Sequence, residues 1–288
     1  MRPKCKIVIS PDWEACLQKA GLSTMDGIYD YEHGRIVTQS GSTQVVHIVL
    51  PDIAPADSVY VKKYWFTTPR RRFRGMLRET FLGTSKARRE YENLVRLNAW
   101  GIPAPAAVAY GEERRGGWLF RSFLISATVP QPTGLDTFLS RVLPSFPPGK
   151  QRETKQEIIR ALADQTHKMH SLRFVHHDYF WRNILLSGQT LDRFYLIDAH
   201  KGRCWKAGDS FKSRVTDLAA LDAPAPWFVN RADRLRFLLR YRNETRLSPE
   251  GRRLARSVLK QAAPMRERQR KRIHACPSPE VSHWASTP

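Results

Sequence analysis

The sequence predicts an α/β (α+β) fold with two lobes, a small N-terminal sheet lobe in residues 1–127 and a mostly helical C-terminal lobe in residues 128–262. Runs rich in β-branched and aromatic residues, typical of strands, gather in the first lobe. Runs with apolar residues at helical spacing dominate the second lobe. Residues 263–288 are basic and rich in proline, and we expect them to form a flexible tail that frays from about residue 262.

The sheet lobe is expected to contain a strand from Gln44 to Leu50, preceded by the short turn Ser40 to Thr43. This turn is the one segment that could serve as a glycine-rich loop over phosphates, but it lacks the G-x-G-x-x-G spacing, and a plain hairpin turn explains it equally well. The next strand, Val59 to Phe66, carries Lys62 and Lys63. Because side chains alternate along a strand, only one lysine can face a given side. We favour Lys62 as the functional one, with Lys63 or a pair of solvated edge lysines as the alternatives.

A helix is predicted from Ser85 to Leu97, because its first residue is a typical N-cap and apolar residues follow at helical spacing. Glu90 lies close to the apolar face of this helix, so we expect it to pair with Lys62. Glu92 is expected to face water. The run Gly101 to Pro105 ends the helix.

Two further strands complete the predicted sheet lobe, Ala106 to Tyr110 and Trp118 to Ile125. The charged, glycine-rich segment Gly111 to Gly117 is expected to be the turn between them. The chain is then expected to cross to the second lobe near Ser126 to Thr128.

The first long helix of the C-terminal lobe is predicted from an apolar stripe at helical spacing, which we expect to be core. The stripe consists of Ile158, Ile159, Leu162, Thr166, Met169 and Leu172. His167 and His170 lie beside this stripe, and we interpret them as structural or exposed residues rather than as ligands. A later helix is indicated from Arg234 to Tyr241.

The most informative motif follows the first of these helices, in the run His176 to Asn183. An H-x-D-x₄-N pattern followed by an aspartate after a short strand is typical of the catalytic loop of protein kinases. In such a loop Asp178 would accept the proton of the attacking hydroxyl. Asn183 and Asp198 would hold Mg²⁺.

The sequence between these polar residues predicts a hairpin that brings Asp198 beside Asn183. Ile184 to Leu186 reads as one strand, Phe194 to Ile197 as its partner, and Gln189 to Asp192 as the turn. The alternative is an ordinary turn in which the Asp and Asn side chains serve only as caps.

With these residues assigned, the chain resembles the lipopolysaccharide kinase family (Kdo/heptose kinases, InaA/WaaP type) of the protein-kinase-like superfamily. The resemblance covers roughly residues 30 to 245. It rests on Tyr60 to Tyr64, Arg89 to Tyr91, Leu97 with Gly101 to Pro103, His176 to Asn183, Ile197 with Asp198, and Asp217 to Leu221.

The resemblance implies phosphorylation of a sugar hydroxyl in the lipopolysaccharide core, with ATP and Mg²⁺ as cofactors. It assigns catalytic roles to Asp178 and Asn183. Residues 1–127 become the ATP-binding lobe, in which Lys62, held by Glu90, grips the phosphates, and Asp198 binds the metal. It further implies that Asp217 braces the catalytic loop, that His176 fixes its geometry, and that backbone groups of residues 126–128 hold adenine.

The chain departs from related patterns at several positions. Some core heptose kinases carry His where this chain has Asn183. His177 replaces the Arg of H-R-D, Ala199 and His200 replace the Phe and Gly of D-F-G, and no A-P-E follows. The loss of that Arg and the short span from Asp198 to Asp217 argue against a phosphorylated activation loop and a peptide-docking surface. Small-molecule or glycolipid acceptors fit better.

Chain length, hydropathy and cysteine content restrict the class of protein and the compartment in which it works. With 288 residues the chain can form one two-lobed unit with its own core. It contains no run of eighteen apolar residues that would predict a membrane-spanning helix, and its first residues lack the apolar core of a signal peptide. Four scattered cysteines, without a C-x-x-C pair, suggest neither zinc nor disulfides. A cytoplasmic location is the simplest expectation.

The formal net charge of +21 predicts attraction to polyanions. Two clusters concentrate the charge, Arg70 to Arg74 with Arg78, and Arg266 to Arg272. We expect the partners to be an anionic glycolipid substrate and the inner face of the bacterial inner membrane. The tail cluster could equally be a solvated helix end. Specific nucleic-acid binding is disfavoured, because the chain lacks zinc-finger spacing, an RNP signature and a clear helix-turn-helix.

Two rival functions stay open at this point. One is a kinase for another small molecule, such as an aminoglycoside-like acceptor, or for a protein. The other is a non-catalytic kinase-like module that binds membranes or nucleic acid. The presence of Lys62, Asp178, Asn183 and Asp198 together argues against the second, because such modules typically lose at least one of these groups.

Overall fold

The computed structural model describes residues 3–50, 56–66, 83–188, 190–205 and 210–275. The chain divides into two compact units. We call residues 1–100 with 105–128 the sheet unit, and residues 101–104 with 129–288 the helical unit. The boundary expected between residues 127 and 128 lies one residue from the division after Thr128.

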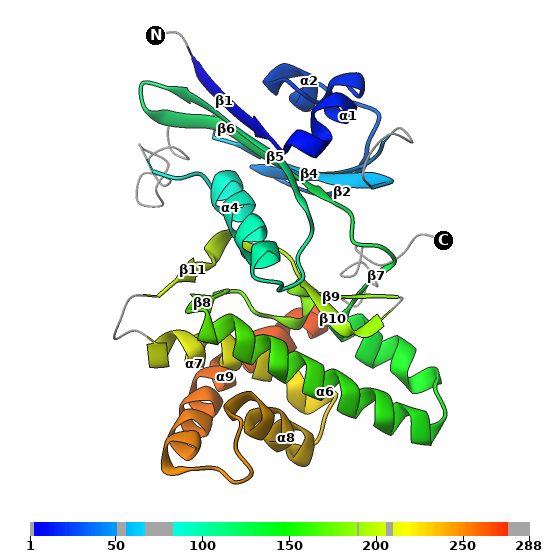
Figure 1. The fold of residues 1–288 in the computed structure, drawn as a ribbon, viewed down its shortest axis with the longest axis vertical. Helices are drawn as coiled ribbons and strands as arrows, with labels where there is room; N and C mark the ends of the chain where they lie inside the picture. The colour runs from blue at the N-terminus through cyan, green and yellow to red at the C-terminus, as the bar shows by residue number, and fades with distance from the viewer. Residues whose placement is uncertain (1–2, 51–55, 67–82, 189, 206–209, 276–288) are drawn as a thin grey trace. The chain divides into compact units, whose positions relative to one another are not determined.

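The sheet unit is built on six strands (Figure 1). These strands are β1 Lys4–Ile9, β2 Arg35–Ser40, β3 Thr43–Val49, β4 Ser58–Trp65, β5 Ala107–Arg115 and β6 Trp118–Ala127. Their order is β1-β5-β6-β4-β3-β2, and every neighbouring pair is antiparallel. The four strands expected from the sequence are therefore present, and β4, rich in Val and Tyr, lies inside the sheet between β3 and β6.

Strand β5 is longer than the sequence indicated. The predicted turn from Gly111 was wrong, because β5 continues to Arg115 and only Gly116 and Gly117, both with positive φ, make the turn. The charged residues stay in the strand because they have partners. Glu113 forms ion pairs with Arg115 and Arg121, so its carboxylate is compensated although it is buried.

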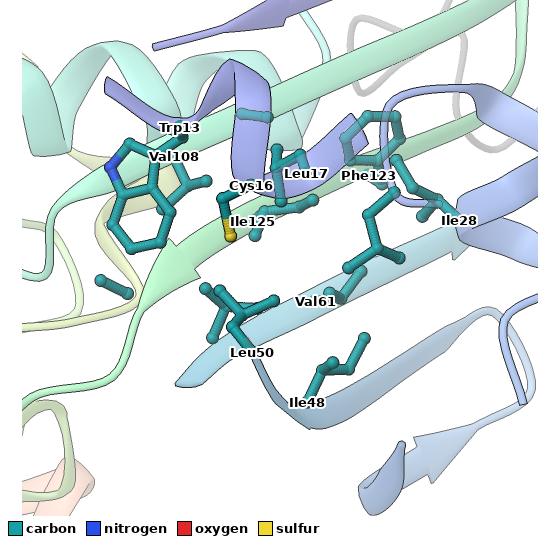
Figure 2. Close-up of a cluster of buried hydrophobic side chains, with 14 of the residues drawn as sticks. Trp13, Cys16, Leu17, Ile28, Ile48, Leu50, Val61, Val108, Phe123 and Ile125 are labelled. Atoms are coloured by element: carbon teal, nitrogen blue, oxygen red, sulfur yellow. The ribbon is translucent and has the colours of Figure 1, made fainter. Parts of the chain in front are cut away.

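The residues before 30 cover one face of this sheet with the short helices α1 Glu14–Lys19 and α2 Met25–Tyr29 and the turn η1 Pro11–Trp13. Figure 2 shows Trp13 and Leu17 from this segment packed with Val61, Phe123 and Ile125 from the strands. All five side chains are buried. This N-terminal segment therefore supplies part of the core of the sheet unit.

Helix α4, Lys86–Ala99, confirms the helix that the sequence indicated. Ser85 is its N-cap, and the Ser85 Oγ accepts a hydrogen bond of 3.0 Å from the Arg88 N–H. Tyr91 packs against Tyr110 of β5, with ring centroids 5.0 Å apart. The helix ends before Gly101, whose φ of 64° suits glycine.

The described part of the helical unit contains helices and two small sheets, one of three strands (β10-β9-β7) and one of two (β11-β8) (Figure 1). Its helices are α5 Leu135–Thr137, α6 Pro148–Ser171, α7 Ser210–Asp222, α8 Arg231–Arg242 and α9 Pro249–Ala275. Its strands are β7 Pro132–Gly134, β8 Phe174–Val175, β9 Ile184–Ser187, β10 Thr190–Leu196 and β11 Arg203–Cys204. Its short helical turns are η2 Phe138–Val142, η3 Leu143–Ser145, η4 Trp181–Asn183, η5 Ala199–Lys201 and η6 Ala225–Trp227.

The apolar stripe of α6 is buried as expected, with one exception. Ile158, Leu162 and Met169 are buried, whereas Leu172 is 36% exposed. Leu172 was wrongly assigned to the core because α6 ends at Ser171 and Leu172 is its C-cap residue. The helix predicted around residues 234–241 is confirmed as α8.

The hairpin after the H-x-D-x₄-N motif is present as β9 and β10, but its turn is shorter than predicted. Strand β10 already begins at Thr190, and the pairing register shifts between Thr190 and Phe194. The extra residues therefore lie in the strand and not in the turn. Gln189 lies outside the described residues.

The chain does not fray at residue 262. Helix α9 continues to Ala275 and passes through Pro264. The helix is held past the proline because Arg266 bonds back to the end of α7, with Nη2 3.2 Å from Asp222 Oδ2 and Nε donating to the Ala223 carbonyl at 3.2 Å. Within the described ranges, no helix is long and apolar enough to cross a membrane. The sheet unit and the helical unit confirm the predicted α/β (α+β) class.

Candidate active site

The sheet unit supplies a buried ion pair. Lys62 Nζ on β4 lies 2.7 Å from Glu90 Oε1 on α4, and their side chains are 11% and 2% exposed. Lys63 points to the other side of β4 and donates to the Tyr29 carbonyl at 3.3 Å. The alternative of two solvated edge lysines was wrong, because β4 is an inner strand and both lysines are buried. Burial lowers the pKa of Lys63, an effect that the nearby Asp30 carboxylate partly opposes.

Replacing Lys62 alone is expected to destabilise the sheet unit. Lys62→Met leaves the Glu90 carboxylate buried without its ammonium partner, and removing one member of a buried pair costs about 3 kcal/mol or more. The double variant Lys62→Met with Glu90→Leu should regain most of this loss, because an apolar pair of similar volume needs no compensation. Urea unfolding of the single and double variants measures both effects.

The matched control for this cycle is the ion pair of Arg88 and Glu92 on the same helix, whose side chains are 39% and 41% exposed. Glu92→Gln should change the free energy of unfolding by less than about 0.5 kcal/mol. A double variant as unstable as Lys62→Met alone would contradict the ion pair as the cause.

The helical unit supplies a polar loop that a buried aspartate organises. Asp217 on α7 is fully buried and accepts two backbone hydrogen bonds, from the His176 N–H at 2.7 Å and from the His177 N–H at 2.8 Å. His177 has a φ of 61°, a left-handed conformation that is uncommon for a residue with a side chain. The carboxylate of Asp217 therefore fixes the backbone immediately before Asp178.

His176 and His170 are both buried and hydrogen-bonded to neighbouring groups, as structural histidines are. His176 is completely buried and donates from Nε2 to the Ile197 carbonyl at 3.1 Å. Burial lowers its pKa, although the nearby carboxylates of Asp217, Asp198 and Asp178 act in the opposite direction. His170 is also buried and contacts the Tyr241 hydroxyl and Asp217. The exposed His167 contacts the Tyr241 carbonyl at 2.7 Å.

The carboxylate of Asp178 is held by two cations. Lys201 Nζ lies 3.0 Å from Oδ2, and Arg182 Nη2 lies 3.1 Å from Oδ1. The Asp178 side chain is 9% exposed. Its direction is therefore set, while each oxygen keeps lone-pair capacity for a proton.

Asn183 and Asp198 are connected through the hairpin. Asn183 Nδ2 donates to the Asp178 carbonyl at 2.8 Å, and the Ile197 N–H donates to the Asn183 carbonyl at 3.0 Å. Asp198 follows directly in the left-handed conformation, with a φ of 59°, and the His200 Nδ1–H donates to its Oδ1 at 3.1 Å. Because the Asn183 amide donates from Nδ2, its Oδ1 is the atom that could bind a cation.

These groups suit a magnesium nucleotide. Carboxylate and amide oxygens are the ligands that Mg²⁺ prefers, and Asn183 and Asp198 offer both kinds from one hairpin. A buried lysine with a carboxylate partner is the usual holder of phosphate oxygens in kinases. The residues of each unit therefore fit the part of the cofactor that the sequence assigned to them.

Sequence reasoning missed three polar residues of the helical unit, Arg182, His200 and Lys201. Arg182 lies inside the motif itself, four residues after Asp178, and the other two follow Asp198 within three residues. A search for charged residues beside each candidate carboxylate would have found them. Their contacts depend on the loop conformation, which no local pattern predicts.

Three other segments were considered from the sequence for nucleotide or polyanion binding. Two of them make ordinary backbone contacts in the sheet unit, and the third lies outside the described residues. The turn considered for a glycine-rich loop is the two-residue hairpin Gly41–Ser42 between β2 and β3. Near the crossing, the Thr128 N–H donates to the Ser58 carbonyl at 3.0 Å inside the sheet unit. The first basic cluster, Arg70 to Arg74 with Arg78, lies outside the described residues.

Comparison with known proteins gives three findings. A family model described as "Lipopolysaccharide kinase (Kdo/WaaP) family" matches residues 25–241. The lipopolysaccharide core heptose(I) kinase WaaP of Pseudomonas aeruginosa is 30% identical over 161 residues, which are 54% of this chain and 59% of that protein. The chain thus spans less than two thirds of this relative.

The third finding is a solved structure, "WaaP in complex with acyl carrier protein", with a TM-score of 0.63 and 22% sequence identity. The match covers 92% of this chain and 98% of the other. At this identity the match establishes the fold, and it agrees with the predicted kinase-like class.

Proposed function

Because the chain belongs to the lipopolysaccharide kinase (Kdo/WaaP) family, we propose that it transfers the γ-phosphoryl group of ATP to a sugar hydroxyl of the lipopolysaccharide core or a similar anionic glycolipid. One observation carries the proposal. Asn183 Nδ2 donates to the Asp178 carbonyl, and the Ile197 N–H, next to Asp198, donates to the Asn183 carbonyl, so one loop and hairpin of the helical unit hold all three residues.

The proposed roles follow from the chemistry of each group. Asp178 orients the sugar hydroxyl and takes its proton at a carboxylate oxygen. Asn183 and Asp198 hold Mg²⁺ through their side-chain oxygens, and Lys62, positioned by Glu90, binds phosphate oxygens of ATP. Bound Mg-ATP supplies the phosphoryl group. Positioning and charge neutralisation provide most of the acceleration, because phosphoryl transfer asks for little covalent chemistry from the protein.

The test is transfer of label from γ-labelled ATP into a lipid extract that contains unphosphorylated acceptor. Label should enter a glycolipid with the native protein. Label appearing in an added small molecule or protein, and not in the glycolipid, would favour the rival acceptors. No transfer to any acceptor would favour the non-catalytic module.

We further propose that the protein works in the cytoplasm, at the inner face of the bacterial inner membrane. The net charge of +21 supports attraction to anionic lipid, at about 1 kcal/mol for each basic residue near the surface. In the second basic cluster Arg266 is occupied by Asp222, whereas Arg268 and Arg270 are exposed on α9. Sedimentation with anionic and with neutral vesicles should show binding only to the anionic ones, and weaker binding in salt.

A second proposed function is binding of an acyl carrier protein, as in the matched WaaP complex. The observation that favours it is a cavity of about 490 Å³ in the helical unit, lined mainly by apolar side chains. Each main helix contributes to its wall. Leu135, Leu162, Leu218, Leu238 and Val258 are examples from α5, α6, α7, α8 and α9 respectively. Such a cavity suits a flexible hydrocarbon chain.

The lining also includes groups that face outward. Leu235 and Leu259 are 45% and 48% exposed, and the lining also carries charges of both signs, from Lys155, Arg231 and the ion pair of Arg234 with Asp222. Because each buried methylene contributes about 0.8 kcal/mol, an acylated carrier should bind at least ten-fold more tightly than the carrier without its chain. Calorimetric titration measures the two affinities.

The cavity variant is Leu259→Trp, which fills space from an exposed position. It should abolish the preference for the acylated carrier. Leu172→Trp is the control, because Leu172 is also exposed and does not line the cavity. Equal affinity of the native protein for both carriers would contradict the proposed role of the cavity.

A further inference from the structure

The ion pairs around Asp178 contain more positive charge than one carboxylate needs. Lys201 comes from η5, and Arg182 comes from η4. Each donates to a different oxygen of Asp178, at 3.0 and 3.1 Å. Two cations therefore share a single negative charge. Asp198 is the expected metal ligand, so its charge would be offset by the metal.

Stability does not explain this arrangement. The Lys201 side chain is 51% exposed and that of Arg182 is 40% exposed. Ion pairs with partners this exposed contribute about 0–1 kcal/mol each, after the entropy lost by two long side chains. The guanidinium of Arg182 is also held in place, because it lies over the Phe180 ring at 4.4 Å from the centroid.

The exposed cations have room to change partner. A lysine carries a compact charge on a flexible stem with three donors, so its ammonium can keep one contact with Asp178 while it bonds a second anion. The chemistry beside Asp178 presents such an anion. Asp178 becomes neutral when it takes the proton of a hydroxyl, and the phosphoryl oxygens nearby carry the remaining negative charge.

We propose that Lys201 is a catalytic residue that neutralises the charge of the transferred phosphoryl group, with Arg182 as its partner. This inference rests on the function proposed above. In the step, the sugar oxygen forms a bond to the γ-phosphorus, the bond from that phosphorus to the ADP oxygen breaks, and ADP leaves with the electron pair. The hydroxyl proton passes to Asp178. As Asp178 loses its charge, Lys201 and Arg182 shift their donors to the phosphoryl oxygens.

The test compares Lys201→Met, Lys201→Gln and Lys201→Arg with the native protein. Lys201→Met should lower kcat by about 100-fold, the usual effect of removing one donor to developing charge. The kcat of Lys201→Arg should stay within about ten-fold of the native value. The affinity for Mg-ADP should stay the same in all variants, because ADP lacks the γ-phosphoryl group. Lys150→Met is the control, since Lys150 is exposed on α6 and remote in sequence from the loop.

The outcomes separate this inference from the function on which it rests. A Lys201→Met protein with near-native kcat, alongside an inactive Asp178→Asn protein, would overturn the role of Lys201 and leave the kinase function standing. An equal loss of kcat in Lys201→Arg and Lys201→Met would also overturn it, because a charge-neutralising role requires rescue by arginine. No transfer by the native protein would overturn both. If Lys201→Met does not fold, Lys201→Gln gives the same comparison.

Discussion

Asp178→Asn is expected to lower kcat by about a thousand-fold or more while Mg-ATP still binds. A positioned general base contributes roughly 10²–10⁴-fold, and asparagine cannot accept the proton of the attacking hydroxyl. The substitution keeps the shape of the side chain, so the backbone contacts that Asp217 makes to the loop should persist. The loss therefore reports on proton transfer and on the lost charge beside Lys201 and Arg182.

A ligand-binding measurement and a control variant distinguish this loss of turnover from unfolding. Saturation with Mg-ATP at about 100 times Kd should stabilise both the native protein and the variant by about 2.7 kcal/mol, seen as a rise in melting temperature. The control is Asp164→Asn, because Asp164 pairs with Arg240 on the exposed side of α6 and should not affect turnover. Near-native kcat in Asp178→Asn would remove Asp178 from the mechanism.

Asp217→Ala on α7 should strongly destabilise the helical unit, because Asp217 holds the backbone of the loop before Asp178. The change leaves two backbone N–H groups without their acceptor, each at a cost of about 1–3 kcal/mol. It also releases His177 from its left-handed conformation. We expect the free energy of unfolding to fall by about 3 kcal/mol or more, and kcat to fall with it because Asp178 follows directly.

Thermal and urea unfolding test this expectation, with turnover measured well below the melting transition. Thr216→Ala is a suitable control, since Thr216 is the adjacent residue on α7 and its hydroxyl donates to the Lys212 carbonyl within the same helix. That variant should stay within about 1 kcal/mol of native. If Asp217→Ala were as stable as this control variant, water or other groups would have to satisfy the two N–H donors.

Local patterns predicted the elements that carry the candidate site. The cap at Ser85, the β-branched run of β4 and the two short apolar strands are each specified within about ten residues, and all three are present. The pairing of Lys62 with Glu90 followed from the face of α4 on which Glu90 lies, and the two side chains do meet. Their catalytic roles stay predictions.

The features that escaped prediction depend on contacts between distant residues. Strand β5 extends through charged residues because Arg121 of the neighbouring strand compensates Glu113. Helix α9 passes Pro264 because Asp222, far away in sequence, holds Arg266. The contact between Lys201 and Asp178 spans 23 residues and needs the folded hairpin. Propensity and periodicity contain none of this information.

The residues that match the family model are fewer than the residues that pack into the two units. The family match begins at residue 25 and ends at residue 241, inside α8. A fragment cut at those limits would lose β1, which shields the outer edge of β5, and an uncovered strand edge invites association between chains. It would also lose Leu254 and Val258 of α9 from the core of the helical unit. Expression fragments of this protein should therefore extend from β1 through α9, so that both units keep their packed elements. They should not be cut at the limits of the family match.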